Sequence, residues 1–92
     1  TKANLLSLRL ANLKHENKIT PAQISMAKQN NVQMALDCAR VTRDILGANG
    51  ISGDYHCMRH MCNLESVYTY EGTNDIHTLI VAQELTGISA FS

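Results

Sequence analysis

The sequence is poor in the features that mark several large classes of protein. It has no Trp, three Tyr and one Phe, which is too few for a surface on which nucleic-acid bases stack. Eight basic and eight acidic side chains give a formal net charge of zero, so no overall field attracts nucleic acid or an anionic membrane. No apolar run approaches the roughly 20 residues that cross a bilayer. We therefore expect neither a nucleic-acid-binding protein nor a membrane span.

Disulfide bonds are not expected either. The three cysteines, Cys38, Cys57 and Cys62, are an odd number, whereas small secreted scaffolds carry even sets of paired cysteines. A reducing compartment fits this count better. Residue 1 is not Met, and the first residues already follow a helical pattern. We interpret the chain as part of a longer protein, whose targeting segment would lie outside it.

What the sequence does contain is the pattern of a small helical domain. Its 92 residues are 45% hydrophobic, which suits one domain with one core. From about Lys2 to Lys14, apolar residues recur every three to four positions, and this spacing predicts a first helix. The residues of this stripe are Ala3, Leu6, Leu10 and Leu13.

The second helix has the clearest start signal. Thr20 suits the N-cap, Pro21 the first helical position and Gln23 the position of a capping-box partner. No further Gly or Pro occurs before Gly47, which predicts a helix of about 26 residues. Its expected apolar stripe comprises Ile24, Ala27, Ala35, Cys38, Ala39, Thr42, Ile45 and Leu46.

Glycines mark the end of this long helix. Gly47, Gly50 and Gly53 lie in the run GANGISGD and predict a loop. The backbone amides of such a loop could cradle a phosphate or the edge of an adenosine, although a helix end followed by a turn is the simpler interpretation. Asp54 is a suitable cap for a third helix, which we expect to end near Ser66.

Four potential metal ligands fall within this third helical segment: His56, Cys57, His60 and Cys62. On a helix the two histidines would share one face, whereas the cysteines would point about 100° or further away from them. One helix cannot arrange these four side chains tetrahedrally around zinc. We therefore expect no metal site, and we interpret these residues as partly buried thiols and surface histidines.

A fourth helix completes the chain. It is expected to begin at Thr73 or Asn74 and to end at Thr86, with Gly87 closing it. No segment alternates in the manner of a strand. The predicted fold is an all-α antiparallel helical bundle that occupies residues 1–92 as one domain.

The strongest candidate for a catalytic site is the run Tyr70-Glu71-Gly72-Thr73. Glu71 lies just before the fourth helix, whose N-terminus stabilises a carboxylate anion. A bound substrate that excludes water destabilises the same anion and raises the pKa of the carboxyl group. A carboxylate whose pKa is set by these two opposing effects can act as a general base. Gly72 lets a ligand approach the backbone, and its N–H could bind an acyl carbonyl. On spacing alone, a solvated glutamate in a capping loop is the simpler explanation.

Several motifs in a fixed order resemble the C-terminal part of the acyl-CoA dehydrogenases. They are a glycine loop after a long helix, Asp54-Tyr55, and the Tyr-Glu-Gly-Thr run before the last helix. Within that family, RHMCNLE at 59–65, YEGTNDIH at 70–77 and TGISAF at 86–91 are most similar to the glutaryl-CoA dehydrogenase branch. The similarity is strong over residues 40–91.

This resemblance implies an FAD-dependent enzyme. Glu71 would remove the α-proton of an acyl-CoA thioester while a hydride from Cβ passes to N5 of FAD. In the glutaryl branch the product then loses CO₂ to give crotonyl-CoA, in lysine and tryptophan degradation, and electron-transfer flavoprotein takes up the electrons. The resemblance also implies a homotetramer in the mitochondrial matrix. The chain alone is expected to be inactive, because the family's N-terminal helical and middle β domains are absent from it.

The resemblance also assigns roles to single residues. Tyr70 and Gly72 match substrate contacts, and Thr73 matches a flavin contact. The other residues that match contacts with FAD, the first five of them with the FAD of a neighbouring subunit, are Asp44, Ile45, Leu46, Gly47, Ala48 and Phe91. Ala48 replaces a glycine of the family pattern, which matters only if the backbone there has a positive φ.

Two alternatives remain open at this point. The first is another short- or branched-chain acyl-CoA dehydrogenase that does not decarboxylate its product. The second is a non-catalytic helical module that acts only in assembly. The intact Glu71 within its motif favours an enzyme over such a module.

Overall fold

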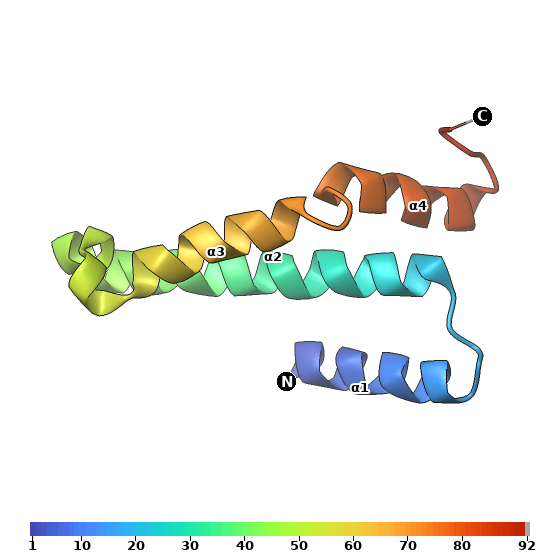
Figure 1. Cartoon of the computed structure of the whole chain (residues 1–92), viewed down its shortest axis with the longest axis horizontal. Coiled ribbons are helices and arrows are strands. Elements are labelled where there is room, and N and C mark those ends of the chain that lie inside the picture. The colour runs from blue at the N-terminus through green and yellow to red at the C-terminus, as the bar shows by residue number, and fades with distance from the viewer. Residues whose placement is uncertain (92) are drawn as a thin grey trace. The chain divides into compact units, whose positions relative to one another are not determined.

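The structure, a computed structural model, describes residues 1–91, which form helices and connecting loops with no strand among them (Figure 1). The α-helices are α1 (Lys2–His15), α2 (Pro21–Leu46), α3 (Cys57–Thr69) and α4 (Asn74–Thr86), and two short 3₁₀ helices, η1 (Gly47–Ile51) and η2 (Gly53–Tyr55), separate α2 from α3. The prediction of an all-α fold is confirmed. None of the helices within residues 1–91 combines the length and hydrophobicity that crossing a bilayer requires.

The chain forms two compact units that share α2. The first unit contains residues 1–31 and the described residues from Gly72 onward, and the second contains residues 32–71. The first half of α2 therefore belongs with α1 and α4, whereas its second half belongs with α3 and the two 3₁₀ helices.

A reciprocal pair of hydrogen bonds starts α2. The backbone N–H of Thr20 donates to Oε1 of Gln23 at 2.9 Å, and the N–H of Gln23 donates to Oγ1 of Thr20 at 3.4 Å. The pair supplies side-chain acceptors to two backbone donors at the helix N-terminus, and the N–H of Gln23 also donates to the backbone carbonyl of Thr20 at 3.2 Å. The predicted bounds of this helix, Pro21 and Leu46, are both confirmed.

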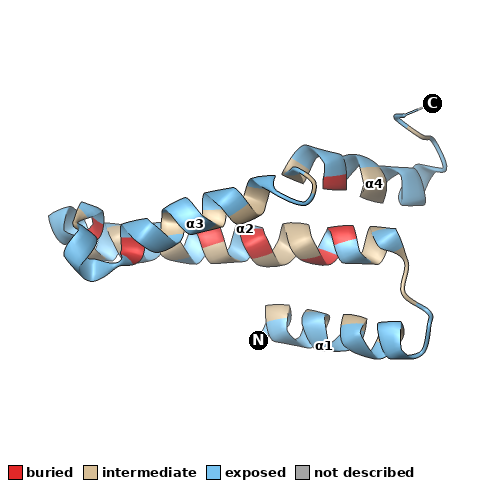
Figure 2. Ribbon diagram, in the orientation of Figure 1, coloured by how far each residue is buried: buried red, intermediate tan, exposed pale blue. Residues whose placement is uncertain are grey.

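In the first unit, α1 and α4 both pack along the first half of α2. The side-chain amide of Asn31 donates to Oγ of Ser7 in α1 at 3.2 Å. The four residues of the predicted α1 stripe are the partly buried residues of that helix, so this prediction is confirmed. The buried residues of the unit are Ala27, Ser25 and His77, of which only Ala27 is apolar (Figure 2). Partly buried apolar residues, among them the α1 stripe and Ile80 and Val81 of α4, add to this small core.

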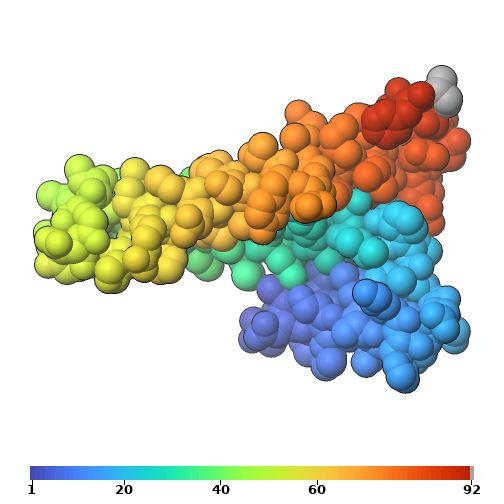
Figure 3. All heavy atoms as spheres, viewed as in Figure 1, coloured from blue at the N-terminus to red at the C-terminus, as the bar shows by residue number. Residues whose placement is uncertain are grey.

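In the second unit, α3 runs back along the second half of α2, and its side chains lie over one face of that part of the helix (Figures 1 and 3). Leu36 is only 2% exposed and, with Val32 and Cys57, forms the core. The thiol of Cys57 donates to the backbone carbonyl of Ala39 at 3.2 Å. An exposed ion pair between Arg40 and Glu65, at 3.6 Å, adds little to stability.

The predicted apolar stripe of α2 is wrong in part. Ile24 is 51% and Ile45 80% exposed, and Cys38 and Thr42 are exposed as well. The buried residues Ser25, Val32 and Leu36 lie outside that stripe. One continuous stripe does not describe α2, because its first half packs against α1 and α4 and its second half against α3.

The predicted bounds of α3 are also wrong. Asp54 does not cap this helix, because it lies in η2, where its N–H donates to Oγ of Ser52 at 3.3 Å. α3 begins only at Cys57, after His56 with a left-handed φ of 61°. It continues past Ser66 to Thr69, since no Gly or Pro interrupts it before Gly72. The segment expected to be a loop is therefore mostly 3₁₀ helix.

The bounds predicted for α4 are confirmed. Its N-cap is Thr73, whose Oγ1 accepts the N–H of Ile76 at 3.3 Å. Gly87 ends the helix with a left-handed φ of 75°, a conformation that glycine adopts at little cost.

Candidate functional site

Tyr70, Glu71 and Gly72 form a local bend of the backbone between α3 and α4. Tyr70 is extended, and the next two residues have left-handed backbones, with φ of 53° at Glu71 and 98° at Gly72. Such a conformation costs a residue with a Cβ about 1 kcal/mol of conformational free energy. The Glu71 side chain is exposed, and within residues 1–91 its carboxylate has no hydrogen bond or ion pair. A strained backbone that presents an unpaired carboxylate marks this bend as a candidate functional site.

Gly72 is enclosed by side chains from α2 and α4. The ammonium of Lys28 donates to its carbonyl oxygen at 2.6 Å. A Cβ built on Gly72 would lie 2.9 Å from Nε2 of His77. The same imidazole contacts Oγ of Ser25 through Nδ1 at 2.8 Å. A glycine is therefore required here both by the positive φ and by the approach of the His77 ring.

The start of α4 is tied to α2 by a further side chain. The amide nitrogen of Gln29 donates to the backbone carbonyl of Asn74 at 3.1 Å and to Oγ1 of Thr78 at 2.6 Å. Together with the Thr73 cap, these bonds fix the first turn of α4. The positive end of this helix follows the bend directly, where it favours negative charge.

Tyr70 borders an open hollow on the second unit. The hollow has a volume of about 450 Å³ and is lined by Glu65, Ser66, Thr69 and Tyr70. The Tyr70 side chain is 55% exposed. A predicted substrate contact is thus accessible from solvent.

The residues predicted to contact FAD lie at the end of α2 and in α4's flanking segments. Asp44, Ile45 and Leu46 form the last turn of α2, and Gly47 and Ala48 begin η1. Gly47 has a φ of 60°, whereas Ala48 is not among the residues with positive φ. Ala48 in place of the family's glycine therefore causes no strain from a left-handed backbone. These five residues belong to the second unit, and Thr73 and Phe91 belong to the first.

The histidine and cysteine residues near α3 are not arranged as a metal site. His56 precedes the helix with a left-handed backbone, so it does not share a helical face with His60 as supposed. Cys57 is buried, whereas Cys38 and Cys62 are exposed, and all three thiols are free. Within residues 1–91, no three His, Cys, Asp or Glu side chains lie close enough together to hold a metal ion.

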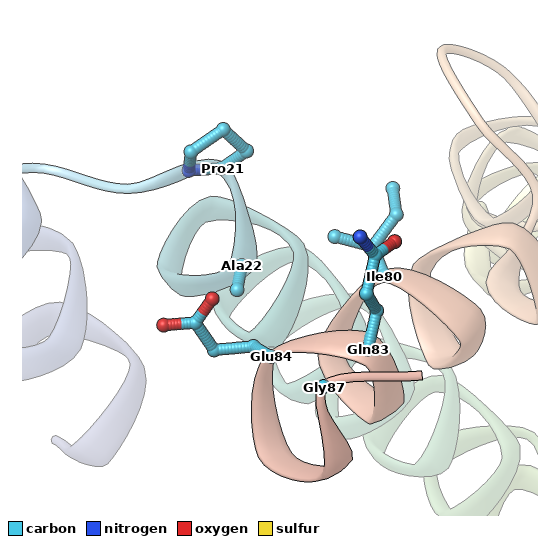
Figure 4. Close-up of a pocket in the computed structure, with 6 residues that line it drawn as sticks. All are labelled: Pro21, Ala22, Ile80, Gln83, Glu84 and Gly87. Atoms are coloured by element: carbon cyan, nitrogen blue, oxygen red, sulfur yellow. The ribbon is translucent and has the colours of Figure 1, made fainter. Parts of the chain in front are cut away.

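A second hollow lies where the start of α2 meets the end of α4 (Figure 4). Its volume is about 300 Å³, and its lining residues are Pro21, Ala22, Ile80, Gln83, Glu84 and Gly87. Glu84 is the one charged residue of this lining. None of the residues predicted to bind substrate or cofactor takes part in it.

The residues that enclose Gly72 were not identified from the sequence. Lys28 is separated from Gly72 by 44 positions, and Ser25 from His77 by 52. Helical periodicity places a residue on a face but does not say which distant residue it meets. The helical neighbours of Ser25 include Lys28 and Gln29, and those of His77 include Asn74, so no apolar face in the sequence pointed to either residue.

Comparison with known proteins identifies the family. Residues 1–86 match the family model described as the acyl-CoA dehydrogenase C-terminal domain. The chain is similar to the crystal structure of glutaryl-CoA dehydrogenase from Mycobacterium smegmatis, with 52% identity over 99% of this chain and 24% of that chain and a TM-score of 0.92. It is also similar to a glutaryl-CoA dehydrogenase from the same organism in complex with FADH2, with 45% identity over 96% of this chain and 23% of that chain and a TM-score of 0.89.

The chain thus spans about a quarter of the length of these solved relatives. The family match covers all four α-helices and the bend that carries Glu71. The chain belongs to the acyl-CoA dehydrogenase family, and it corresponds to the C-terminal domain of that family.

Proposed function

We propose that this chain is the helical C-terminal part of an FAD-dependent dehydrogenase that acts on glutaryl-CoA, with Glu71 as the base that removes the α-proton. The observation that carries the proposal is the exposed Glu71 carboxylate, which is unpaired within residues 1–91 and is presented by a left-handed backbone with φ of 53°. Similarity to two glutaryl-CoA dehydrogenases, at 52% and 45% identity, supports the choice of substrate.

The residues around the bend suit proton abstraction. The α-proton of a thioester is weakly acidic, so a carboxylate removes it only if the negative charge that develops on the thioester oxygen is stabilised. The N–H of Gly72 donates no hydrogen bond within the described chain and is available to that oxygen. The N-terminus of α4, which begins two residues further on, favours the same negative charge. Exposed Tyr70 would contact the acyl chain.

Residues assigned to contacts with FAD are accessible from solvent, as contact with a bound cofactor requires. Ile45 is 80% and Phe91 61% exposed, and no atom lies within 4 Å of a Cβ built on Gly47. We assign the contacts with FAD to these three residues and to Asp44, Leu46, Ala48 and Thr73. When bound, FAD supplies the acceptor for the hydride that leaves Cβ of the substrate.

The rest of the proposed function rests on the similarity to the glutaryl branch. The dehydrogenated product would lose its distal carboxylate as CO₂, and protonation of the carbanion left behind would give crotonyl-CoA. Electron-transfer flavoprotein is the proposed electron acceptor, a homotetramer the proposed assembly and the mitochondrial matrix the proposed location. Light scattering of the full-length protein and cell fractionation test the last two.

The function is tested by mixing the full-length protein with glutaryl-CoA without oxygen and following flavin absorbance and CO₂ release. We expect rapid loss of flavin absorbance together with CO₂. Glu71→Gln is expected to slow both by at least about 100-fold, since general bases contribute about that much. Glu16→Gln is the matched control, because Glu16 is exposed and only pairs with Lys18 at 3.8 Å; it should leave both rates unchanged.

The other outcomes separate the alternatives. Loss of flavin absorbance only with other acyl-CoA substrates would retain the family chemistry and reject glutaryl-CoA. An unreactive flavin with every acyl-CoA would favour the non-catalytic module. Full activity in the Glu71→Gln variant would reject Glu71 as the base.

A further inference from the structure

We propose that Ser25, Lys28 and His77 act as positioning residues that hold Gly72, and through it the backbone of Glu71, in the conformation that proton abstraction needs. The three residues are called the bracket below. The inference rests on the proposed function of Glu71 and extends it to side chains that touch neither substrate nor cofactor. The three bracket residues and Gly72 all belong to the first unit.

The first part of the bracket is the His77 imidazole. It is 9% exposed, and its Nε2 has no hydrogen-bond partner among the described residues. A buried polar atom without a partner costs about 1–3 kcal/mol, so its position calls for another reason. That reason is its contact with Gly72, because the ring occupies the space where a Cβ would lie, 2.9 Å from Nε2. The imidazole thereby limits the positions that the Gly72 backbone can take.

Ser25 fixes the orientation of this ring. Its Oγ lies 2.8 Å from Nδ1 of His77, and its side chain is buried at 3% exposure. If Nδ1 carries the hydrogen and donates it to Ser25, then Nε2 is a bare acceptor that faces the Gly72 α-carbon. The opposite tautomer would bury an N–H donor without an acceptor, which is the more costly arrangement. The contact therefore favours one tautomer and one ring orientation.

Lys28 holds the other side of Gly72. Its ammonium donates a charge-assisted hydrogen bond of 2.6 Å to the Gly72 carbonyl, which sets the orientation of the peptide between Gly72 and Thr73. The next turn is already fixed by the Thr73 cap. With its α-carbon packed against His77 and its carbonyl bound by Lys28, Gly72 has little freedom left.

The bracket bears on Glu71 through one peptide bond. Glu71 has a φ of 53°, a conformation that a residue with a Cβ keeps only when its surroundings impose it. The peptide that follows Glu71 also carries the Gly72 N–H proposed to bind the thioester oxygen. Holding Gly72 therefore sets the direction of the base's backbone and of the oxygen's donor together. A displacement of about 1 Å at such a site can slow a reaction about 100-fold.

A kinetic experiment on the full-length, FAD-loaded protein tests the role of Lys28. Lys28→Met is expected to lower kcat by about 10- to 100-fold, while KM and FAD content change far less. Lys28→Arg, which keeps a cationic donor, is expected to recover most of the rate. Lys14→Met removes an exposed lysine of α1 in the same unit and is the matched control, with no change in kcat expected.

A second experiment tests the contact between His77 and Gly72 independently of activity. Thermal unfolding is measured for Gly72→Ala, His77→Ala and the double variant. If the imidazole excludes a Cβ, Gly72→Ala should lower Tm markedly in the natural background and by several degrees less in the His77→Ala background. The part of the loss that remains reflects the positive φ of Gly72. Ser25→Ala removes the contact that orients the His77 ring. In the Ser25→Ala background, Gly72→Ala should therefore also lower Tm by less than it does in the natural background.

The two experiments also separate failure of the bracket from failure of the proposed function. Equal losses of Tm in both backgrounds, or an unchanged kcat in Lys28→Met, would overturn the bracket even if Glu71→Gln is inactive. If no acyl-CoA reacts with the unmodified protein, the proposed function fails, and the positioning role fails with it whatever the Tm values show.

Discussion

At the scale of single residues, three glycines after α2 differ in what a side chain would meet. A Cβ on Gly50 would overlap the backbone carbonyl of Arg43. Gly47 has open space around it but a φ of 60°, and Gly53 has open space without a positive φ. The three positions thus separate steric overlap from backbone strain within one short segment.

We expect alanine at these positions to destabilise the protein in a fixed order. Gly47→Ala should lower the free energy of unfolding by about 1–2 kcal/mol through backbone strain alone. Gly50→Ala should cost more, since backbone atoms of η1 or α2 must move to relieve the overlap. Gly53→Ala is the matched control and should stay within about 0.5 kcal/mol of the parent. Denaturant midpoints of the full-length variants give the order, and a Gly50→Ala variant as stable as Gly53→Ala would contradict the packing described here.

The candidate site shows what residue patterns can and cannot predict. Glu71 and Gly72 were predicted as site residues from a short motif, because the motif and the helix start behind it are local in sequence, and these roles stay predictions. The left-handed backbone of Glu71 was not foreseen, since glutamate has no preference for that conformation. The roles of the bracket residues were not predicted either, because Lys28 and Ser25 lie 44 and 52 positions away from their partners.

At the scale of helices, accuracy followed the strength of the capping signals. α2 and α4 begin and end where Thr20, Thr73 and the glycines predicted. The start of α3 was misplaced because Ser52 caps η2 and His56 precedes α3 with a left-handed backbone. No sequence signal at either position predicts these conformations. The apolar faces were predicted well for α1, which packs along one helix, and poorly for α2, which packs against different helices along its length.

The capping box of α2 leads to a second prediction. Thr20→Ala should lower the free energy of unfolding by about 1 kcal/mol, because the N–H of Gln23 loses its bond to Oγ1 and keeps only the backbone carbonyl of residue 20, at 3.2 Å. Thr42→Ala is the matched control. Thr42 is exposed within the same helix and bonds only to the carbonyl of Cys38, and alanine is the better helix former there. Denaturant unfolding of the full-length protein distinguishes them, and equal effects of the two substitutions would argue against a working cap.

At the scale of the whole chain, the buried core is small and much apolar surface is exposed. The exposed large side chains include Leu5 at 61%, Leu8 at 60%, Leu85 at 80% and Ile88 at 74%. Contiguous apolar surface marks contact with other protein, and Leu5 and Leu8 lie side by side on one face of α1, three positions apart. The family's other domains and neighbouring subunits are the proposed source of that contact.

We therefore expect the isolated chain of residues 1–92 to be inactive and to associate with itself as its concentration rises. Sedimentation velocity over a range of concentrations measures the association, and fluorescence titration measures FAD binding. Weak FAD binding or none is expected, because most of the cofactor pocket is proposed to lie in the other domains. A stoichiometric FAD complex of micromolar affinity would contradict this expectation.

The division of the chain into two units has a consequence for the order of folding. Residues 32–71 form the second unit without interruption, whereas the first unit joins residues 1–31 to those after 71. Closing the intervening loop costs entropy unless that stretch is already compact, and contacts between distant residues slow folding. During synthesis α4 leaves the ribosome after α1, α2 and α3, so His77 and Gly72 meet Ser25 and Lys28 only after the whole second unit has emerged. The proposed catalytic bend would thus take shape later than the second unit, and a nascent chain would hold its glutamate in an ordinary, unstrained loop until then.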